Sequence, residues 1–192
     1  VTYHVWPTAP EDLGDAIRQL YNENHLGANV TVPHKEAAVE MVDDVDPMAQ
    51  RIGAVNTIVN RANPNGQTRL TGHNTDGTGF LRALREECGF NPQGRRILVL
   101  AAGGAARGVV LALSRESAAG LTIANRTVSR AQVLAQLASD NGIESSAISL
   151  TGPELDAAAE SADLIVNCTT MGMTHGPDET SSPLHKGQIS SK

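Results

Sequence analysis

The chain has 192 residues, enough for two domains of roughly 100 residues each or for one larger domain. Its hydrophobic content of 40% and charged content of 19% are typical of a soluble globular protein, and its apolar runs are too short to span a bilayer. The formal net charge of -6 argues against non-specific binding to nucleic acid. We therefore expect a partner that is a small molecule.

The two cysteines, Cys88 and Cys168, lack CxxC spacing, and the six histidines are scattered along the chain. This pattern predicts no metal site and favours a reduced, cytoplasmic protein. The chain starts without methionine at VTYHVWPTAP, carries no secretory signal there, and stops at GQISSK after a strand-like segment and a polar loop. We expect a fragment that lacks both ends of a longer protein. The sequence leaves the oligomeric state open, with a homodimer as one expectation.

The first part of the chain predicts a small α/β domain. Leu13, Ala16, Ile17 and Leu20 are spaced for one face of a helix, and residues 62–67 have the composition of a hairpin turn. The predicted strands are residues 2–6, 27–32, 54–61 and 67–72, and the predicted helices are residues 10–25, 34–42, 46–52 and 77–88. The polar segment GFNPQGRR that follows resembles a linker, so we place the domain boundary near Gly89.

The second part alternates strictly between strands and helices. Strands are predicted at residues 96–101, 121–125, near 147 and at 163–167, with helices at 105–117, 128–141 and 153–161. This alternation predicts a parallel sheet with helices on both faces. The fold class is therefore α/β with two domains: residues 1–88, an N-terminal α/β domain, and residues 89–192, a domain with a Rossmann-like parallel sheet.

The segment LVLAAGGAARG places small residues between a buried strand and a helix, which is the context of a dinucleotide-binding turn. Gly103 and Gly104 allow the backbone to approach a pyrophosphate at the helix N-terminus. The pattern is not a full GxGxxG, because Ala101 stands where the first glycine is expected. Since alanine should avoid positive φ, we expect this replacement to alter the turn and to affect pyrophosphate affinity.

Arg126 follows the next strand, where NAD enzymes carry an acidic residue for the ribose 2′-hydroxyl. A guanidinium there suits a 2′-phosphate, and Asn125, Thr127 and Arg130 can add hydrogen bonds or charge. NADP is therefore favoured over NAD. A methyltransferase would also begin with a strand and a glycine-rich turn, but it would normally carry the acid that is missing here.

Lys35, in GANVTVPHK, is predicted to open a helix after the carboxyl end of a strand. A helix dipole and burial would lower its pKa toward the value that proton transfer needs, and a carboxylate would raise it again. Asp76, in HNTDG, is a candidate partner, although it could also cap the helix that follows.

GANVTVPHK, GAVNT at residues 53–57, GHNTDGTGF at 72–80, the GGAAR turn, NRT and DLIVNCTTMGM occur here in an order that resembles the shikimate dehydrogenases. The resemblance runs from about Tyr3 to Gly187. It implies an NADP-dependent, reversible reduction of 3-dehydroshikimate to shikimate, as in aromatic amino acid and chorismate biosynthesis. By this resemblance Lys35 is the catalytic acid/base, Asp76 is its hydrogen-bonded partner, and Thr31 and Asn56 hold ring hydroxyls of the substrate.

The resemblance also makes residues 1–88 the substrate domain and residues 89–192 the NADP domain, and it implies a set of cofactor-binding residues. They are Ala101, Ala102, Gly103, Gly104, Ala105, Asn125, Arg126, Thr127, Arg130, Thr169 and Met171. The serine pair that binds the substrate carboxylate in this family, and the family's C-terminal glutamine, match nothing in the sequence, so we expect the isolated chain to turn over little. Two alternatives remain: an NAD-using quinate/shikimate dehydrogenase, and a catalytically inactive dinucleotide-binding fragment.

Overall fold

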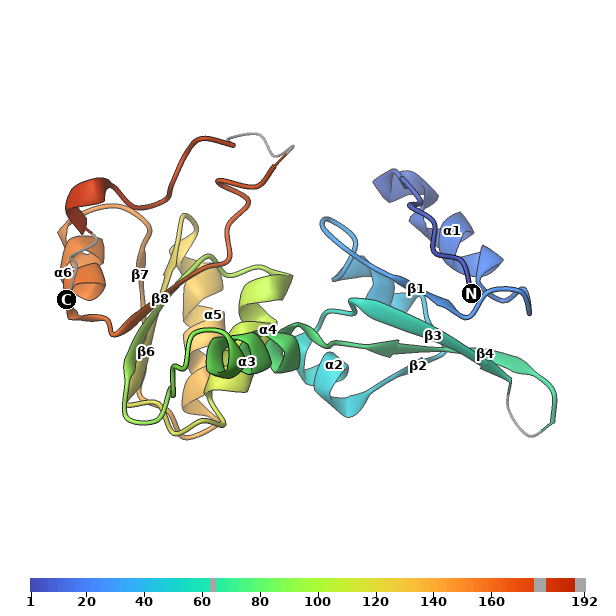
Figure 1. The fold of residues 1–192 in the computed structure, drawn as a ribbon, viewed down its shortest axis with the longest axis horizontal. Helices are drawn as coiled ribbons and strands as arrows, with labels where there is room; N and C mark the ends of the chain where they lie inside the picture. Colours follow the sequence, from blue (N-terminus) through green and yellow to red (C-terminus); the bar gives the residue numbers. More distant parts are fainter. Residues whose placement is uncertain (63–64, 175–178, 189–192) are drawn as a thin grey trace. The chain divides into compact units, whose positions relative to one another are not determined.

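The computed structural model describes residues 1–62, 65–174 and 179–188. The chain forms two compact units, Val1–Thr75 and Asp76–Lys192. Figure 1 labels most of the helices and strands of both units. Each unit has its own sheet and its own buried core. The predicted α/β fold class is confirmed.

The sheet of the first unit is mixed and has the strand order β1-β3-β4-β2. β1 (Gly27–Asn29) pairs antiparallel with β3 (Thr57–Ala62), β3 pairs antiparallel with β4 (Thr68–His73), and β2 (Asp44–Val45) lies parallel to β4. The helical segments are η1 (Pro10–Asp12), α1 (Leu13–Gln19), η2 (Ala37–Glu40) and α2 (Pro47–Ile52). Their apolar side chains pack with Val55, Ile58 and Leu70 into one core.

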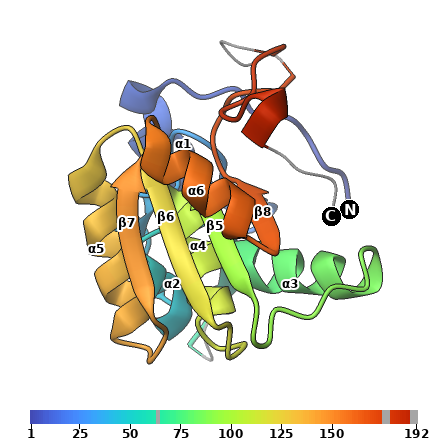
Figure 2. The ribbon, with the colours of Figure 1, turned by 90° about the vertical axis from the view of Figure 1, so that its left-hand side faces the viewer.

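The second unit carries the predicted parallel sheet, in the order β7-β6-β5-β8. Its strands are β5 (Arg96–Leu100), β6 (Gly120–Asn125), β7 (Ser145–Ser149) and β8 (Leu164–Asn167). Figure 2 shows α4 (Gly104–Leu113) and α5 (Val128–Ser139) on one face and α6 (Pro153–Ser161) on the other. α3 (Asp76–Glu86) precedes β5, and η3 (Lys186–Gln188) lies near the end. Because both faces are covered, Ile97–Leu100 of β5 are all buried.

Three predicted elements of the first unit were wrong. The strand predicted at residues 2–6 is not formed, and Tyr3 and Val5 are exposed, because no strand of the described residues pairs with it. The helix predicted at 34–42 is only the short 3-10 helix η2, in which Ala38 alone is buried. The helix predicted at 10–25 is a 3-10 turn and an α-helix that together end at Gln19.

The boundary between the units also differs from the prediction. The second unit starts at Asp76, so α3 belongs with the parallel sheet and not with the first unit. The polar composition of residues 89–96 is that of a surface loop within the second unit. The cause is packing: Phe80 and Leu81 of α3 lie against the core formed by β5, β6, α4 and α5.

Candidate active site

The glycine-rich turn follows β5 at the carboxyl edge of the parallel sheet. Strand order places β5 between β6 and β8, and the connections after β5 and before β8 run on opposite faces of the sheet (Figure 2). In open α/β sheets the ligand crevice lies at such a switch point, beyond the carboxyl ends of the strands. The turn and the loop after β8 therefore flank the expected crevice.

The turn exposes backbone to this crevice. Gly103 is the N-cap of α4, and a Cβ placed on it would meet no atom within 4 Å. The space in front of the helix N-terminus, where amide N–H groups point outward, is thus open. Ala102 and Ala106 are buried against the core and hold the start of α4 close to the sheet.

Ala101 adopts φ 96°, a backbone conformation that favours glycine. Its N–H donates to the carbonyl of Ala124 on β6 at 2.8 Å. The expectation that alanine avoids positive φ was wrong. The hydrogen bond to β6 on one side and the start of α4 on the other constrain the backbone of Ala101 to this conformation. Ala101 thus makes the turn of a glycine at a cost in strain.

The second group of predicted residues follows β6. Asn125 ends the strand and donates its side-chain N–H to the carbonyl of Thr127 at 2.9 Å, which shapes the turn into α5. Arg126, Thr127 and Arg130 are exposed. In the described part of the chain Arg126 forms no ion pair with a carboxylate. Its guanidinium can therefore pair with an anionic ligand.

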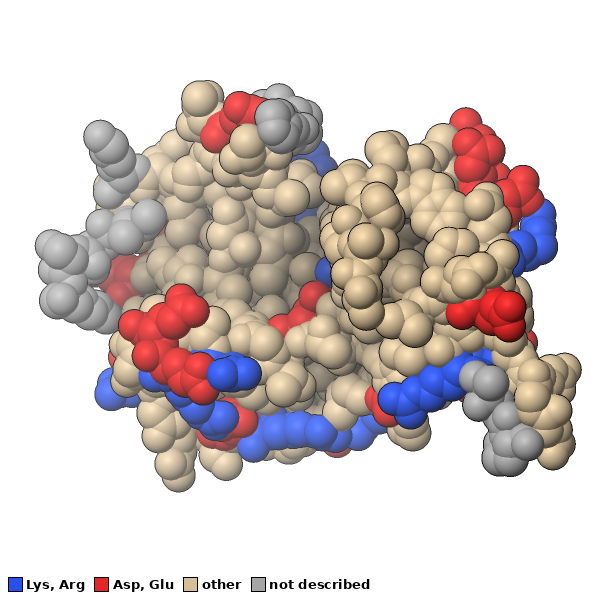
Figure 3. Space-filling model, turned by 45° about the vertical axis from the view of Figure 1, so that its right-hand side comes forward, with Lys and Arg blue, Asp and Glu red and all other residues tan. Residues whose placement is uncertain are grey.

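Several other arginines are paired with carboxylates. Figure 3 shows Lys and Arg side chains lying next to Asp and Glu side chains over the face drawn there. Within the first unit Arg69 pairs with Asp44 at 2.9 Å, and within α3 Arg82 pairs with Glu86 at 2.9 Å. Exposed pairs of this kind contribute little stability, but they remove charge that could attract an anion.

The loop after β8 is held by Asn167, a residue that sequence reasoning missed. Its Oδ1 accepts from the backbone N–H of Thr169 at 2.9 Å and from the Thr169 hydroxyl at 2.7 Å. The Thr169 oxygen in turn accepts from the N–H of Met171 at 3.1 Å. Thr169 thus shapes the loop and Met171 lies on it; the available signal was an asparagine at a strand end followed by two threonines.

In the first unit, Asn56 is one of two polar residues that are buried among the described positions. Its Oδ1 accepts from the backbone N–H of Thr75 at 3.0 Å and from the Thr57 hydroxyl at 2.9 Å, and its Nδ2 lies 3.1 Å from the Thr75 hydroxyl. The β3–β4 hairpin creates this cluster, because Thr57 is paired with His73. Thr57 and Thr75 were also missed; each follows an asparagine in an Asn-Thr pair.

Lys35 lies beside the same segment. Its carbonyl accepts from the N–H of Val55 at 2.8 Å, and its side chain is half-buried. Lys35 stands in a turn before η2 and not in an α-helix, so the argument from a helix dipole was wrong. Thr31 is exposed, and its carbonyl accepts from the N–H of His34 at 2.9 Å. Lys35, Thr31 and Asn56 thus belong to one unit.

Asp76 opens α3 and is the first residue of the second unit. Its charge acts on Cys168, the residue after β8. Burial raises the pKa of the Cys168 thiol to about 11, and the negative charge of Asp76 adds to the rise. Asp76 therefore lies close to the loop that carries Thr169 and Met171.

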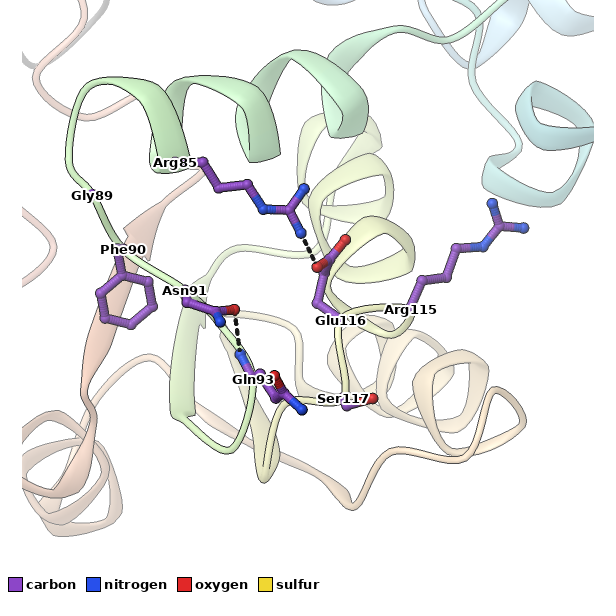
Figure 4. Close-up of a pocket in the computed structure, with 8 residues that line it drawn as sticks. All are labelled: Arg85, Gly89, Phe90, Asn91, Gln93, Arg115, Glu116 and Ser117. Carbon is purple, nitrogen blue, oxygen red and sulfur yellow. Dashed lines mark hydrogen bonds and ion pairs between the residues drawn. The ribbon is translucent and has the colours of Figure 1, made fainter.

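A pocket of the second unit lies elsewhere. It measures about 510 Å³ and is lined by Arg85, Gly89, Phe90, Asn91, Gln93, Arg115, Glu116 and Ser117. These residues precede β5 and β6, so the pocket is at the amino edge of the sheet, opposite the glycine-rich turn. In Figure 4 Arg85 points to Glu116, with which it pairs, and Arg115 extends away. The pocket is open, and two of its three charged residues, Arg85 and Glu116, are already paired with each other.

Two further observations concern metals and membranes. Among the residues that the structure describes, no group of three or more His, Cys, Asp or Glu side chains could hold a metal ion. No helix in the same ranges has the length and apolar character needed to cross a membrane.

Comparison with known proteins gives consistent matches. The family described as "Shikimate dehydrogenase substrate binding domain" matches residues 1–58, and that described as "Shikimate / quinate 5-dehydrogenase" matches residues 84–175. An NADP(+) shikimate dehydrogenase from Methanopyrus kandleri is 43% identical over 97% of this chain and 64% of its own length. The chain thus spans less than two thirds of this relative.

The chain is also similar to solved structures of dehydrogenases. The shikimate 5-dehydrogenase of Thermus thermophilus, in complex with NADP(H) and shikimate, is 38% identical with a TM-score of 0.75, covering 96% of this chain and 62% of that one. The quinate dehydrogenase of Corynebacterium glutamicum, in complex with NAD, is 32% identical with a TM-score of 0.74, covering 94% and 61%.

Proposed function

Because the chain belongs to the shikimate dehydrogenase family, we propose that it forms the catalytic part of an enzyme that reversibly reduces 3-dehydroshikimate to shikimate with NADPH. The observation that carries the proposal is the shared position of the open glycine-rich turn and the exposed Arg126 at the carboxyl edge of one parallel sheet. The first unit is then the substrate domain and the second the NADP domain.

The residues present fit this dinucleotide. The open space at Gly103 admits a pyrophosphate to the α4 N-terminus, and Arg126 offers a bidentate partner to a 2′-phosphate. The turn that carries Arg126 also includes Asn125, Thr127 and Arg130. The backbone expected around the phosphates is that of Ala101, Ala102, Gly104 and Ala105. The loop next to the crevice carries Thr169 and Met171. When bound, NADPH supplies the hydride that reduces the substrate carbonyl.

The substrate side is assigned to the first unit together with Asp76. Addition of hydride to the carbonyl carbon leaves an alkoxide, and we assign the proton that it needs to the Lys35 ammonium. In the oxidation direction neutral Lys35 takes the hydroxyl proton. By resemblance to the family we assign Asp76 as the hydrogen-bonded partner of Lys35, and Thr31 and Asn56 as the residues that bind ring hydroxyls. The buried cluster around Asn56 supports this, since its carbonyl oxygen is held by Thr57 and Thr75.

Steady-state kinetics on the complete gene product tests the assignment. We expect Lys35→Met and Asp76→Asn each to lower kcat by roughly 10²- to 10⁴-fold, the usual effect of removing a general acid or base. The Kd for NADPH, measured by fluorescence, should stay unchanged because neither residue contacts the phosphates. A wild-type protein that binds NADPH but does not turn over shikimate would instead favour an inactive dinucleotide-binding module.

The second candidate function is an NAD-using quinate/shikimate dehydrogenase, which the similarity to the Corynebacterium glutamicum enzyme favours. Arg126 separates the two candidates. We expect wild-type kcat/KM to be at least tenfold higher with NADP than with NAD, and Arg126→Asp to reverse this preference. Arg115→Asp makes the same charge change at the amino edge of the sheet and should leave the preference as it is. An unchanged preference in Arg126→Asp contradicts the assignment.

We further propose a cytoplasmic location, which two unpaired cysteines, Cys88 and Cys168, support. Cell fractionation tests it. Light scattering of the complete gene product decides between a monomer and the homodimer that the sequence leaves open.

A further inference from the structure

α3 rests on α4 through a glycine next to Asp76. A Cβ placed on Gly77 would lie 2.5 Å from the backbone oxygen of Gly108 and 2.9 Å from the Cβ of Ala112. Both distances are far below ordinary van der Waals contact, which begins at 3.4 Å. The backbone atom cannot turn aside as a flexible side chain would, so the two helices can approach this closely only while residue 77 has no side chain.

A second glycine on the same helix behaves differently. Gly79 is exposed, and a Cβ placed on it would meet no atom within 4 Å. The requirement for glycine is therefore specific to position 77 and does not reflect a general need for flexibility in α3. Gly79 provides a matched control within the same helix.

The contact joins the two functional ends of this unit. α4 begins at Gly104, directly after the glycine-rich turn, and Asp76 directly precedes Gly77. Phe80 and Leu81 fix the rest of α3 against the core. Because helices are stiff over this length, the separation of α3 and α4 at Gly77 sets the distance between the Asp76 carboxylate and the turn.

We propose that Gly77 is a positioning residue, whose close contact with Gly108 holds the Asp76 carboxylate in register with the glycine-rich turn. The inference rests on the proposed function, since that function gives Asp76 its role in proton transfer. Restoring an ordinary 3.4 Å contact from 2.5 Å would move α3 by about 1 Å. A misplacement of about that size can cost on the order of 10²-fold in rate.

The experiment compares Gly77→Ala with Gly79→Ala in the complete gene product. We expect Gly77→Ala to lower kcat 10- to 100-fold and to raise the solvent isotope effect on kcat, because proton transfer becomes slower. The Kd for NADPH should stay within about twofold, since the turn itself is untouched. Gly79→Ala should retain wild-type kcat and isotope effect.

A second readout does not depend on turnover. Asp76 acts on the Cys168 thiol, so the pKa of this thiol reports the position of the carboxylate. In a Cys88→Ser background, the pH dependence of alkylation should give a lower Cys168 pKa in Asp76→Asn than in wild type. Gly77→Ala should shift the pKa in the same direction, and Gly79→Ala should leave it unchanged.

The outcomes separate the two claims. If wild type does not turn over shikimate but Gly77→Ala shifts the Cys168 pKa, the proposed function fails and the positioning role stands. Wild-type kcat, isotope effect and Cys168 pKa in Gly77→Ala would overturn the positioning role. If Gly77→Ala does not fold, Ala112→Val at a half-exposed position crowds the same contact from α4, and it must show the same kinetic and pKa changes or the proposal is wrong.

Discussion

Ala101 carries the clearest strain at the scale of a single residue. A non-glycine residue at φ 96° costs about 1–3 kcal/mol, and glycine relieves this cost while adding roughly 0.5–1 kcal/mol of chain entropy. We therefore expect Ala101→Gly to raise the free energy of unfolding by about 1 kcal/mol, as measured by urea denaturation.

The matched control for Ala101→Gly is Ala105→Gly, in the first turn of α4, where alanine is helical and glycine should destabilise by up to about 1 kcal/mol. Destabilisation by both replacements would contradict the strain at Ala101. The Kd for NADPH of Ala101→Gly should not rise, because the glycine can adopt the same turn.

Single residues also show where sequence reasoning ended. Arg126 and Gly103 could be located from the strand-turn-helix order, because both follow directly from where a strand stops. The positive φ of Ala101 could not, because it results from hydrogen bonding to β6 rather than from the preference of alanine. Gly77 is visible in the sequence as part of the DGTGF segment. Its contact partner Gly108 is distant in the chain, so only the packing of α3 against α4 identifies the role of Gly77.

At the scale of elements, the β3–β4 hairpin builds the Asn56 cluster. Thr57 is the residue of β3 that donates to the Asn56 carbonyl, and Thr75 approaches from the end of β4. We expect Thr57→Val to lower the free energy of unfolding by about 1 kcal/mol, the usual contribution of one hydrogen bond, and to raise the KM for shikimate more than it lowers kcat. Denaturation and steady-state kinetics measure the two effects.

Thr71→Val is the control for Thr57→Val, because it makes the same isosteric change on β4, away from Asn56. It should be close to wild type in both measurements. Equal KM effects of the two variants would show that the cluster does not orient Asn56.

The elements themselves differed in how well their patterns identified them. β5 and α4 were predicted well because a run of buried residues and a row of small and apolar residues leave little choice. α2 was predicted well because both of its ends carry capping residues. The Asp46 carboxylate accepts from the backbone N–H of Met48 at 2.9 Å, and Gly53 ends the helix at φ 67°. The helix at 34–42 failed because alanine and glutamate satisfy helical periodicity without supplying an apolar face large enough to bury.

At the scale of the whole molecule, binding of the dinucleotide should stabilise the fold. A ligand that binds only the folded state at 100 times its Kd adds about 2.7 kcal/mol to the free energy of unfolding. We expect NADP to raise the Tm, NAD at the same concentration to raise it less, and Arg126→Asp to abolish the difference. Thermal melting followed by circular dichroism measures this. Equal shifts for NAD and NADP in wild type would count against a 2′-phosphate site.

The division of the chain into units was the feature that composition predicted least well. The polar segment at 89–96 has the composition of a linker. The units nevertheless separate between Thr75 and Asp76, inside the HNTDG motif that contains the proposed site residue Asp76. The composition of a segment indicates only whether it is exposed to water, whereas a compact unit is defined by which helices and strands pack against one another. Here one glycine contact and two apolar side chains, Phe80 and Leu81, decided where α3 belongs.

The contact between Gly77 and Gly108 limits where this chain can exchange segments with its relatives. A chimera cut at Gly89 would combine α3 of one parent with α4 of another, so two surfaces that evolved apart would have to meet without a Cβ between them. A cut between Thr75 and Asp76 keeps both helices from one parent. Chimeras of relatives should therefore fold more often when they are joined between Thr75 and Asp76 than when they are joined at Gly89, even though the segment at Gly89 has the composition of a linker.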